Sequence, residues 1–359
     1  MPLLPEEQPT PTQTVGNTGL ITATLNTGSS PVAQIVDDNQ TVTTGVFNFT
    51  SADESFTITD VTVTVGSASA VQNVILKNAA TGATLASKPG ATTITFNDIA
   101  LPVAANDTSA LQIEVQLGTV GFEAGATGSS IQTTVTAATA QNAQGTDSAV
   151  AGLGSGVNGR AMYVYKAIPS IALVALPTTN LTPNSEVVMQ KFTVSSTGGT
   201  IEWDEILFTV SKTASVGIVV TEAELTLYDV TSGSRTEVKG AFTTVGTESG
   251  DTDLETADTG GTVAFDATSP EQIAGSRTYE LVETNGSAVS ANGSMGTRIT
   301  EPSAFAASVA GASVSGAHSL VWSDTSAQLH TILTTDWTND YKVKGLPTTT
   351  QTAWVCRCP

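Results

Sequence analysis

Apolar and polar residues alternate at every second position in many short stretches of this chain. In one stretch the apolar positions skip a residue partway: Phe56, Ile58, then Val61, Val63 and Val65. A period of two is typical of strands with one buried face, and a shift of phase within a run predicts a β-bulge. Turn signals containing Gly, Pro or Asn separate the stretches, so the pattern predicts short antiparallel strands.

The same pattern occurs twice. Residues Phe47–Val65 match Phe192–Val210 without a gap, and the skip recurs between Trp203 and Ile206. Three further blocks follow in the same order: Val74–Gly82 with Leu225–Gly233, Ile94–Phe96 with Val263–Phe265, and Met162–Tyr165 with Leu320–Ser323. About seven short strands per repeat predict an all-β fold of two tandem antiparallel β-sandwich domains, of the Ig-like kind, with an extra N-terminal strand.

Domain boundaries follow from the repeat, with Pro31–Val36 opening the first domain as Pro169–Val174 opens the second. The predicted organisation is a Pro-rich N-terminal arm with an extra strand (1–30), β-sandwich domain one (31–167), β-sandwich domain two (168–347) and a C-terminal tail (348–359).

The extra strand lies within residues 18–28, which the repeat leaves over. It begins near Leu20 and places Ile21, Ala23 and Leu25 on one face. An isolated strand is not stable in water, so it has to pair. Either it folds back onto the first domain, or these four residues form an assembly strand donated to a sheet edge of the next subunit. The second arrangement is a head-to-tail contact that grows a fibre.

Charge and hydropathy exclude some partners. The 359 residues carry 13 basic and 33 acidic side chains, a net charge of −20, and no stretch concentrates Lys and Arg. We therefore expect no nucleic-acid partner. No run of about 18 apolar residues occurs, so we expect no membrane span.

Cysteines and glycosylation sequons bear on location. Cys356 and Cys358 lie in the last four residues, and their spacing disfavours an intrachain disulfide, leaving intermolecular pairing or a bound metal open. A cysteine-free folded body fits an extracellular location. Six sequons make glycans possible partners: Asn39, Asn48, Asn106, Asn180, Asn285 and Asn292.

Catalytic patterns are missing from the sequence. The two histidines, His318 and His330, belong to no recognisable triad or metal motif and are interpreted as packing or surface residues. The adjacent carboxylates Asp53–Glu54 and Asp204–Glu205 should face opposite sides of a strand, so neither pair should flank one bond. We expect that the protein is not an enzyme.

One loop is a candidate cation site. Asp251, Asp253 and Glu255 offer carboxylates at alternate positions, which suits Ca²⁺, while a solvated acidic loop is the other interpretation. Asp37 and Asp38 are a weaker candidate of the same kind.

The tryptophans are interpreted as packing residues. Trp203 and Trp322 occupy core-type positions in the repeat. Trp337 and Tyr341 have the spacing of one helical turn, with Asp336 as its cap.

The sequence resembles a known class of protein in three places: Phe192–Ser196, Leu227–Gly233 and, most specifically, the closing block Trp322–Pro347. These are similar to the β-sandwich modules of surface-layer-like secreted structural proteins of uncultured small-genome bacteria. The terminal residues Ala353–Pro359 depart from that pattern. The resemblance implies a cell-surface or extracellular-fibre role and no catalytic residues.

These observations together predict an extracellular self-assembling structural protein, a filament or surface-layer subunit whose partners are copies of itself. A cell-surface adhesin or carbohydrate-binding module is the main alternative, and a viral decoration or tail protein is a third.

Overall fold

The computed structural model describes residues 19–181, 185–213, 219–246, 254, 258–286, 293–306 and 318–355. Apart from two short 3-10 helices, η1 (Ala68–Ala70) and η2 (Glu222–Glu224), the regular elements of these residues are β-strands, most of them in antiparallel pairs. No helix in this part of the chain is long and apolar enough to cross a membrane. The predicted all-β, antiparallel fold is confirmed.

The first sandwich, here called the first unit, comprises residues 20–165. One sheet has the order β1 (Leu20–Leu25), β3 (Thr41–Ala52), β9 (Thr108–Leu117), β5 (Val71–Asn78), β6 (Thr84–Pro89). The facing sheet has the order β12 (Asp147–Ala149), β11 (Thr133–Asn142), β4 (Phe56–Val65), β7 (Thr93–Phe96), with β8 (Leu101–Val103) on β4 and β13 (Val157–Asn158) on β11. A small sheet joins β10 (Ser129–Ile131), β14 (Met162–Tyr165) and β2 (Gln34–Asp37).

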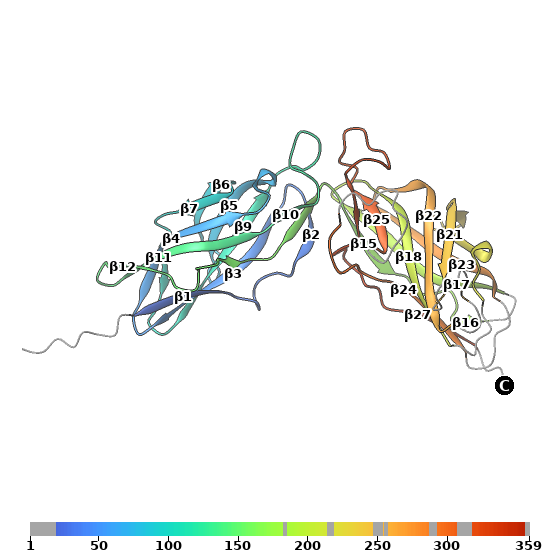
Figure 1. The fold of residues 1–359 in the computed structure, drawn as a ribbon, viewed down its shortest axis with the longest axis horizontal. Coiled ribbons are helices and arrows are strands. Elements are labelled where there is room, and N and C mark those ends of the chain that lie inside the picture. Colours follow the sequence, from blue (N-terminus) through green and yellow to red (C-terminus); the bar gives the residue numbers. More distant parts are fainter. Residues whose placement is uncertain are drawn as a thin grey trace, which may run out of the picture.

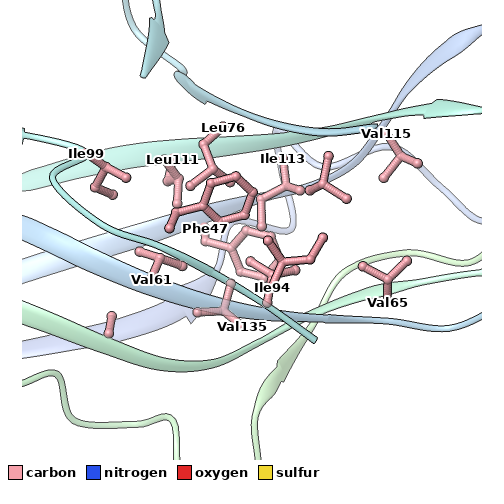
Figure 2. Close-up of a cluster of buried hydrophobic side chains, with 14 of the residues drawn as sticks. Phe47, Val61, Val65, Leu76, Ile94, Ile99, Leu111, Ile113, Val115 and Val135 are labelled. Carbon is pink, nitrogen blue, oxygen red and sulfur yellow. The ribbon is translucent and has the colours of Figure 1, made fainter. Parts of the chain in front are cut away.

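Alternating apolar residues of the two sheets form the core of the first unit (Figure 2). Phe47, Leu76 and Leu111 come from one sheet, and Val61 and Val135 from the other. All five are fully buried. Burying a side chain of this size stabilises the fold by about 1.5–3 kcal/mol. Because every second residue of a strand faces the core, this gain favours apolar residues at alternate positions, and the period of two therefore predicts the strands.

The second unit comprises residues 168–355. Its first sheet has the order β15 (Ile168–Leu173), β17 (Ser185–Thr197), β23 (Ser276–Gly286), β19 (Leu225–Asp229), β20 (Thr236–Glu237). The facing sheet has the order β16 (Asn180–Leu181), β27 (Gln351–Val355), β24 (Ser294–Ile299), β18 (Ile201–Lys212), β22 (Gly260–Ile273), β21 (Gly240–Val245). β25 (Leu320–Ser323) pairs with β18, and β26 (Trp337–Asn339) pairs with β25.

The internal repeat extends to strand register. Val61 of β4 faces Phe96 of β7, just as Ile206 of β18 faces Phe265 of β22. The five-stranded sheets also correspond strand for strand, because β1, β3, β9, β5 and β6 hold the places of β15, β17, β23, β19 and β20.

The predicted bulge is present in both units. In β4 the register against β11 passes from Ile58 to Asp60 and leaves Thr59 as the extra residue. In β18 the register against β25 passes from Trp203 to Glu205 and leaves Asp204 as the extra residue. The skipped position in the alternating pattern therefore marks a residue with no partner across the ladder.

The start of the repeat differs from the sequence alignment. Leu20–Leu25 forms β1, which holds in the first unit the place that β15 holds in the second, so this strand belongs to the repeat and is not an addition to it. Pro31–Val36 leads instead into β2, which pairs in parallel with β14. Both segments are short, apolar and preceded by turn residues, and alternation alone does not distinguish them.

Two further expectations from the end of each repeat are wrong. β14, matched to β25 in sequence, pairs with β10 and β2, whereas β25 pairs with the bulged strand β18. Trp337 lies in the strand β26 and not in a helical turn. Backbone pairing with β25 and burial of the Trp337 ring override the local helical spacing.

Candidate functional site

The two units meet in a joint, defined here as the contacts of Thr127, Tyr163, Tyr165 and Lys166 with residues 305–306 and 318–341. The sandwiches lie end to end, with β2 and β10 of the first unit and β15 and β25 of the second at the joint (Figure 1). The Tyr165 ring packs against Trp322, with ring centroids 4.8 Å apart, and both side chains are buried. The Tyr165 hydroxyl lies 3.3 Å from the Thr338 hydroxyl.

A buried carboxylate ties the joint together. Asp324 is fully buried, and its Oδ2 accepts hydrogen bonds from the Lys166 backbone N–H at 2.9 Å and from the Thr127 hydroxyl at 2.5 Å. Its Oδ1 accepts the Ser326 N–H at 3.2 Å. Burial raises the pKa of Asp324, and these donors oppose the shift. One side chain of the second unit thus bonds both to the first unit, at Thr127, and to the connection between the units, at Lys166.

A second aromatic cluster covers another part of the joint. Tyr163 stacks on Phe305 with centroids 5.2 Å apart and meets Tyr341 edge-on at 5.6 Å. Because aromatic pairs and hydrogen bonds fix the relative orientation of the units, the joint resists bending in a way that an extended linker does not.

A groove of about 750 Å³ opens between the units. Val32 and Ile35 line it from the first unit, and Ile168, Glu301 and Lys342 line it from the second. Lys342 is paired with Glu301 at 3.3 Å, and the exposed Lys344 lines the same wall.

The N-terminal strand pairs within its own chain. Leu20 to Leu25 run antiparallel to β3, with Ile21 and Ala23 buried and Leu20 54% exposed. On the outer side of the strand, the Ala23 N–H donates to the Ala151 carbonyl oxygen and the Ala151 N–H donates to the Ile21 carbonyl oxygen. Of the two arrangements expected from the sequence, the structure shows the intramolecular one. Both edges of the strand form backbone hydrogen bonds, one with β3 and the other with Ala151.

Two sets of predicted residues lie outside the described residues. They are the calcium ligands Asp251, Asp253 and Glu255, and the terminal cysteines Cys356 and Cys358. The calcium loop therefore stays a prediction.

The weaker calcium candidate has other partners. Asp38 accepts the Val120 N–H at 3.0 Å and the Asn39 side-chain amide at 2.7 Å. Asp37 accepts the Gln40 side-chain amide at 3.1 Å. Asp38 thereby ties the end of β2 to the segment after β9, which accounts for it without a cation.

The histidines lie in different surroundings. His330 stands between Asp336 at 2.8 Å and Glu202 at 3.0 Å and packs beside the Trp337 ring. His318 is 3% exposed and lies 3.5 Å from a Glu205 oxygen. Neither lies within hydrogen-bond distance of a Ser or Cys nucleophile in the described residues; the nearest hydroxyl partner, that of Thr334, is 3.3 Å from His330 and belongs to a local turn.

The expectation that Asp204 and Glu205 point apart is wrong. Both side chains, together with Asp266 of β22, place a carboxylate oxygen within 4.8 Å of the other two. The cause is the bulge, because the extra residue Asp204 breaks the alternation of faces at that point. We call these three residues the bulge cluster.

Trp203 and Trp322 are core residues as predicted, both fully buried. Asp266 and Asp324 were not predicted from the sequence. Asp324 follows a buried strand directly, and Asp266 follows the repeat residue Phe265. Their positions in the repeat could have drawn attention to them, but neither residue belongs to a recognisable sequence motif.

Of the sequons, Asn39, Asn106 and Asn180 are exposed and Asn48 is half-buried. The structure therefore leaves three of these asparagines accessible for glycan attachment.

No protein-family model matches the sequence, and no curated protein is similar to it. Among solved structures, the C-terminal domain of the Streptococcus agalactiae antigen I/II polypeptide BspA is 8% identical, covers 78% of this chain and 94% of its own, and has a TM-score of 0.22. The C-terminal domain of the Streptococcus pyogenes antigen I/II-family protein AspA is 9% identical, with the same coverage and a TM-score of 0.23. Red sea bream transglutaminase has a TM-score of 0.18 at 7% identity, covering 78% of this chain and 28% of its own. Similarity at such TM-scores carries no argument about function.

Proposed function

We propose that this chain is an extracellular structural protein, a subunit of a surface layer or filament made from copies of itself. The observation that carries the proposal is the joint, where buried contacts and not a free linker hold the two units. A lattice or filament repeats at fixed distances, so it needs subunits of fixed length. The closing block Trp322–Pro347, which resembles surface-layer-like proteins, supplies the joint residues Trp322 and Asp324.

An apolar loop beside the joint supplies a contact for the next copy. Leu329 and Leu333 are 81% and 86% exposed, and Ile332 is exposed as well. Exposed apolar groups gathered on one loop mark interaction sites more often than isolated ones do. Phe122, exposed on the facing loop of the first unit, lines the same small pocket as Gln328.

Assembly of this kind does not depend on strand donation. Donation would remove β1 from β3 and from Ala151, exposing the buried side chains of Ile21 and Ala23 until the next subunit replaced them. We therefore propose that folded subunits meet through side chains.

The carbohydrate-binding alternative has less support. Sugar-binding faces use exposed aromatic rings. Trp203, Trp322 and Trp337, the three tryptophans whose side chains the structure describes, are all buried, and among the described aromatic residues only Phe122 is exposed.

Electron microscopy of negatively stained protein over a range of concentrations tests the proposal. We expect ordered filaments or sheets above a threshold concentration, and fewer or none with Leu329→Ser and Leu333→Ser. Val245→Ser is the matched control, since Val245 is also an exposed apolar residue and lies on β21.

Light scattering that reports a monomer at every concentration, together with binding to a glycan array, would favour the adhesin alternative and overturn the proposal. If assembly is unchanged in both leucine variants, the contact between copies lies elsewhere on the surface.

A further inference from the structure

The bulge cluster gathers three carboxylates in a largely buried place. Asp204 is 1% exposed and Glu205 3% exposed, and Asp266 closes the cluster at its solvent side. Their oxygens lie within 4.8 Å of one another. Like charges at this distance repel strongly away from water, so an arrangement of this kind needs a compensating partner.

The described residues supply no sufficient partner. Asp204 Oδ1 and Glu205 Oε2 are buried and have no hydrogen-bond donor. Among the ion pairs of the described residues, no Lys or Arg reaches any of the three carboxylates, and His318 approaches Glu205 only to 3.5 Å. Burial first, and then the nearby carboxylates of Asp266, Glu205 and Glu202, together raise the pKa of Asp204 to about 7.

The first unit provides an internal comparison. There the bulge holds Thr59 and Asp60, and the Thr59 hydroxyl donates to Asp60 Oδ2 at 2.8 Å. Asn97 follows Phe96 at the position where Asp266 follows Phe265. One carboxylate with its own donor in the first unit thus corresponds to three carboxylates in the second.

A small pocket of about 160 Å³ gives access to the cluster. Glu205 and Asp266 line it together with the threonines Thr243 and Thr262 of β21 and β22. Water entering through this pocket can complete the coordination of a bound ion.

We propose that the bulge cluster binds one divalent cation, and that this cation is Ca²⁺. The ligands are all carboxylate oxygens, which hard cations prefer. Two oxygens bound to one Ca²⁺ at about 2.4 Å lie at most about 4.8 Å apart, and every pair among the three carboxylates meets this limit. The ion would tie β18 to β22 at the bulge. These three residues differ from Asp251, Asp253 and Glu255, the calcium ligands predicted from the sequence.

Terbium luminescence tests the site in the full chain, because Tb³⁺ occupies Ca²⁺ sites and is sensitised by a nearby tryptophan. Trp203 directly precedes Asp204. Substituting Asp251→Asn, Asp253→Asn and Glu255→Gln first removes the other predicted site. We expect this protein to bind one Tb³⁺, to release it to Ca²⁺, and to gain several degrees in melting temperature when Ca²⁺ is added after chelation.

Two variants in that background distinguish binding at the bulge cluster from nonspecific binding of cations to acidic side chains. Asp204→Asn with Asp266→Asn should weaken Tb³⁺ and Ca²⁺ binding at least about tenfold and remove the thermal response, because two of three anionic ligands are lost. Asp60→Asn, at the corresponding bulge of the first unit, should leave both unchanged. If the double variant does not fold, Asp266→Asn alone tests the site from its solvent side.

Unchanged Tb³⁺ binding in the cluster variants, or no binding by the background protein at millimolar Ca²⁺, would overturn the site. Displacement of Tb³⁺ by Zn²⁺ or Mn²⁺ at lower concentrations than Ca²⁺ would overturn the assignment of the ion and indicate that His318 joins the ligands.

Discussion

Asp324 gives the most direct test of the joint. Replacing it with Ala removes the acceptor of the Lys166 N–H, the Thr127 hydroxyl and the Ser326 N–H. Thr127 belongs to the first unit and Lys166 to the connection between the units, so the substitution breaks contacts that hold the joint as well as a local turn. Asp324→Asn keeps the size and one carbonyl oxygen and serves as the conservative variant.

The expected loss follows from these bonds. A hydrogen bond to a charged acceptor contributes about 1.5–3 kcal/mol, and three meet here. Burial of the carboxylate, which raises the pKa of Asp324, offsets part of that gain. We therefore expect Asp324→Ala to lower the free energy of unfolding by about 2–4 kcal/mol, and Asp324→Asn to lower it by about half as much because an acceptor remains.

Two measurements separate stability from geometry. Tryptophan fluorescence during urea unfolding reports the second unit, which contains all four tryptophans. Spin labels at the exposed residues Ala80 and Ala274, with Cys356 and Cys358 changed to Ser, report the distance between units. We expect Asp324→Ala to lower the fluorescence midpoint and to broaden the distance distribution.

A distance distribution that is as narrow in Asp324→Ala as in the parent protein would refute a role of Asp324 in holding the joint. A lower unfolding midpoint with an unchanged distribution would show that Asp324 stabilises only its own loop, and that the aromatic contacts of Tyr165 and Tyr163 set the geometry of the joint.

Three further predictions follow from other sites. Ile21→Asp places a charge in a buried position of β1 and should cost roughly 3 kcal/mol or more in the first unit; circular dichroism should show an earlier transition while the tryptophan midpoint is unchanged. Burial raises the pKa of Asp340 to about 6, so the folded state holds its proton more tightly than the unfolded chain. Stability should therefore fall by up to about 3 kcal/mol as pH rises from about 4 to about 6, and Asp340→Asn should remove this slope in urea titrations. Gly345→Ala should lower the melting temperature more than Gly233→Ala; both have positive φ, but only at Gly345 does a Cβ meet backbone, 1.8 Å from the Ile171 carbonyl oxygen.

Local patterns in the sequence determined much of the fold. Alternation identifies the strands because burying the apolar face of a strand stabilises the fold regardless of which strand packs beside it. The pattern is therefore visible within each strand's own sequence. The skip between Trp203 and Ile206 predicted the bulge for the same reason, since a change of face is visible within one strand. The match of Ile94–Phe96 to Val263–Phe265 also holds down to register.

Partners distant in the chain were decided only by the tertiary structure. Tyr165 and Trp322 belong to segments that were matched in sequence as equivalent blocks of two repeats, yet their rings pack against each other across the joint. Asp204 and Glu205 were expected to face apart, yet the bulge and the pairing of β18 with β22 bring both to Asp266. Alternation specifies which face a side chain takes. Which strand or unit covers that face depends on the burial of the whole chain and on its connections, and these are set by residues far away in sequence.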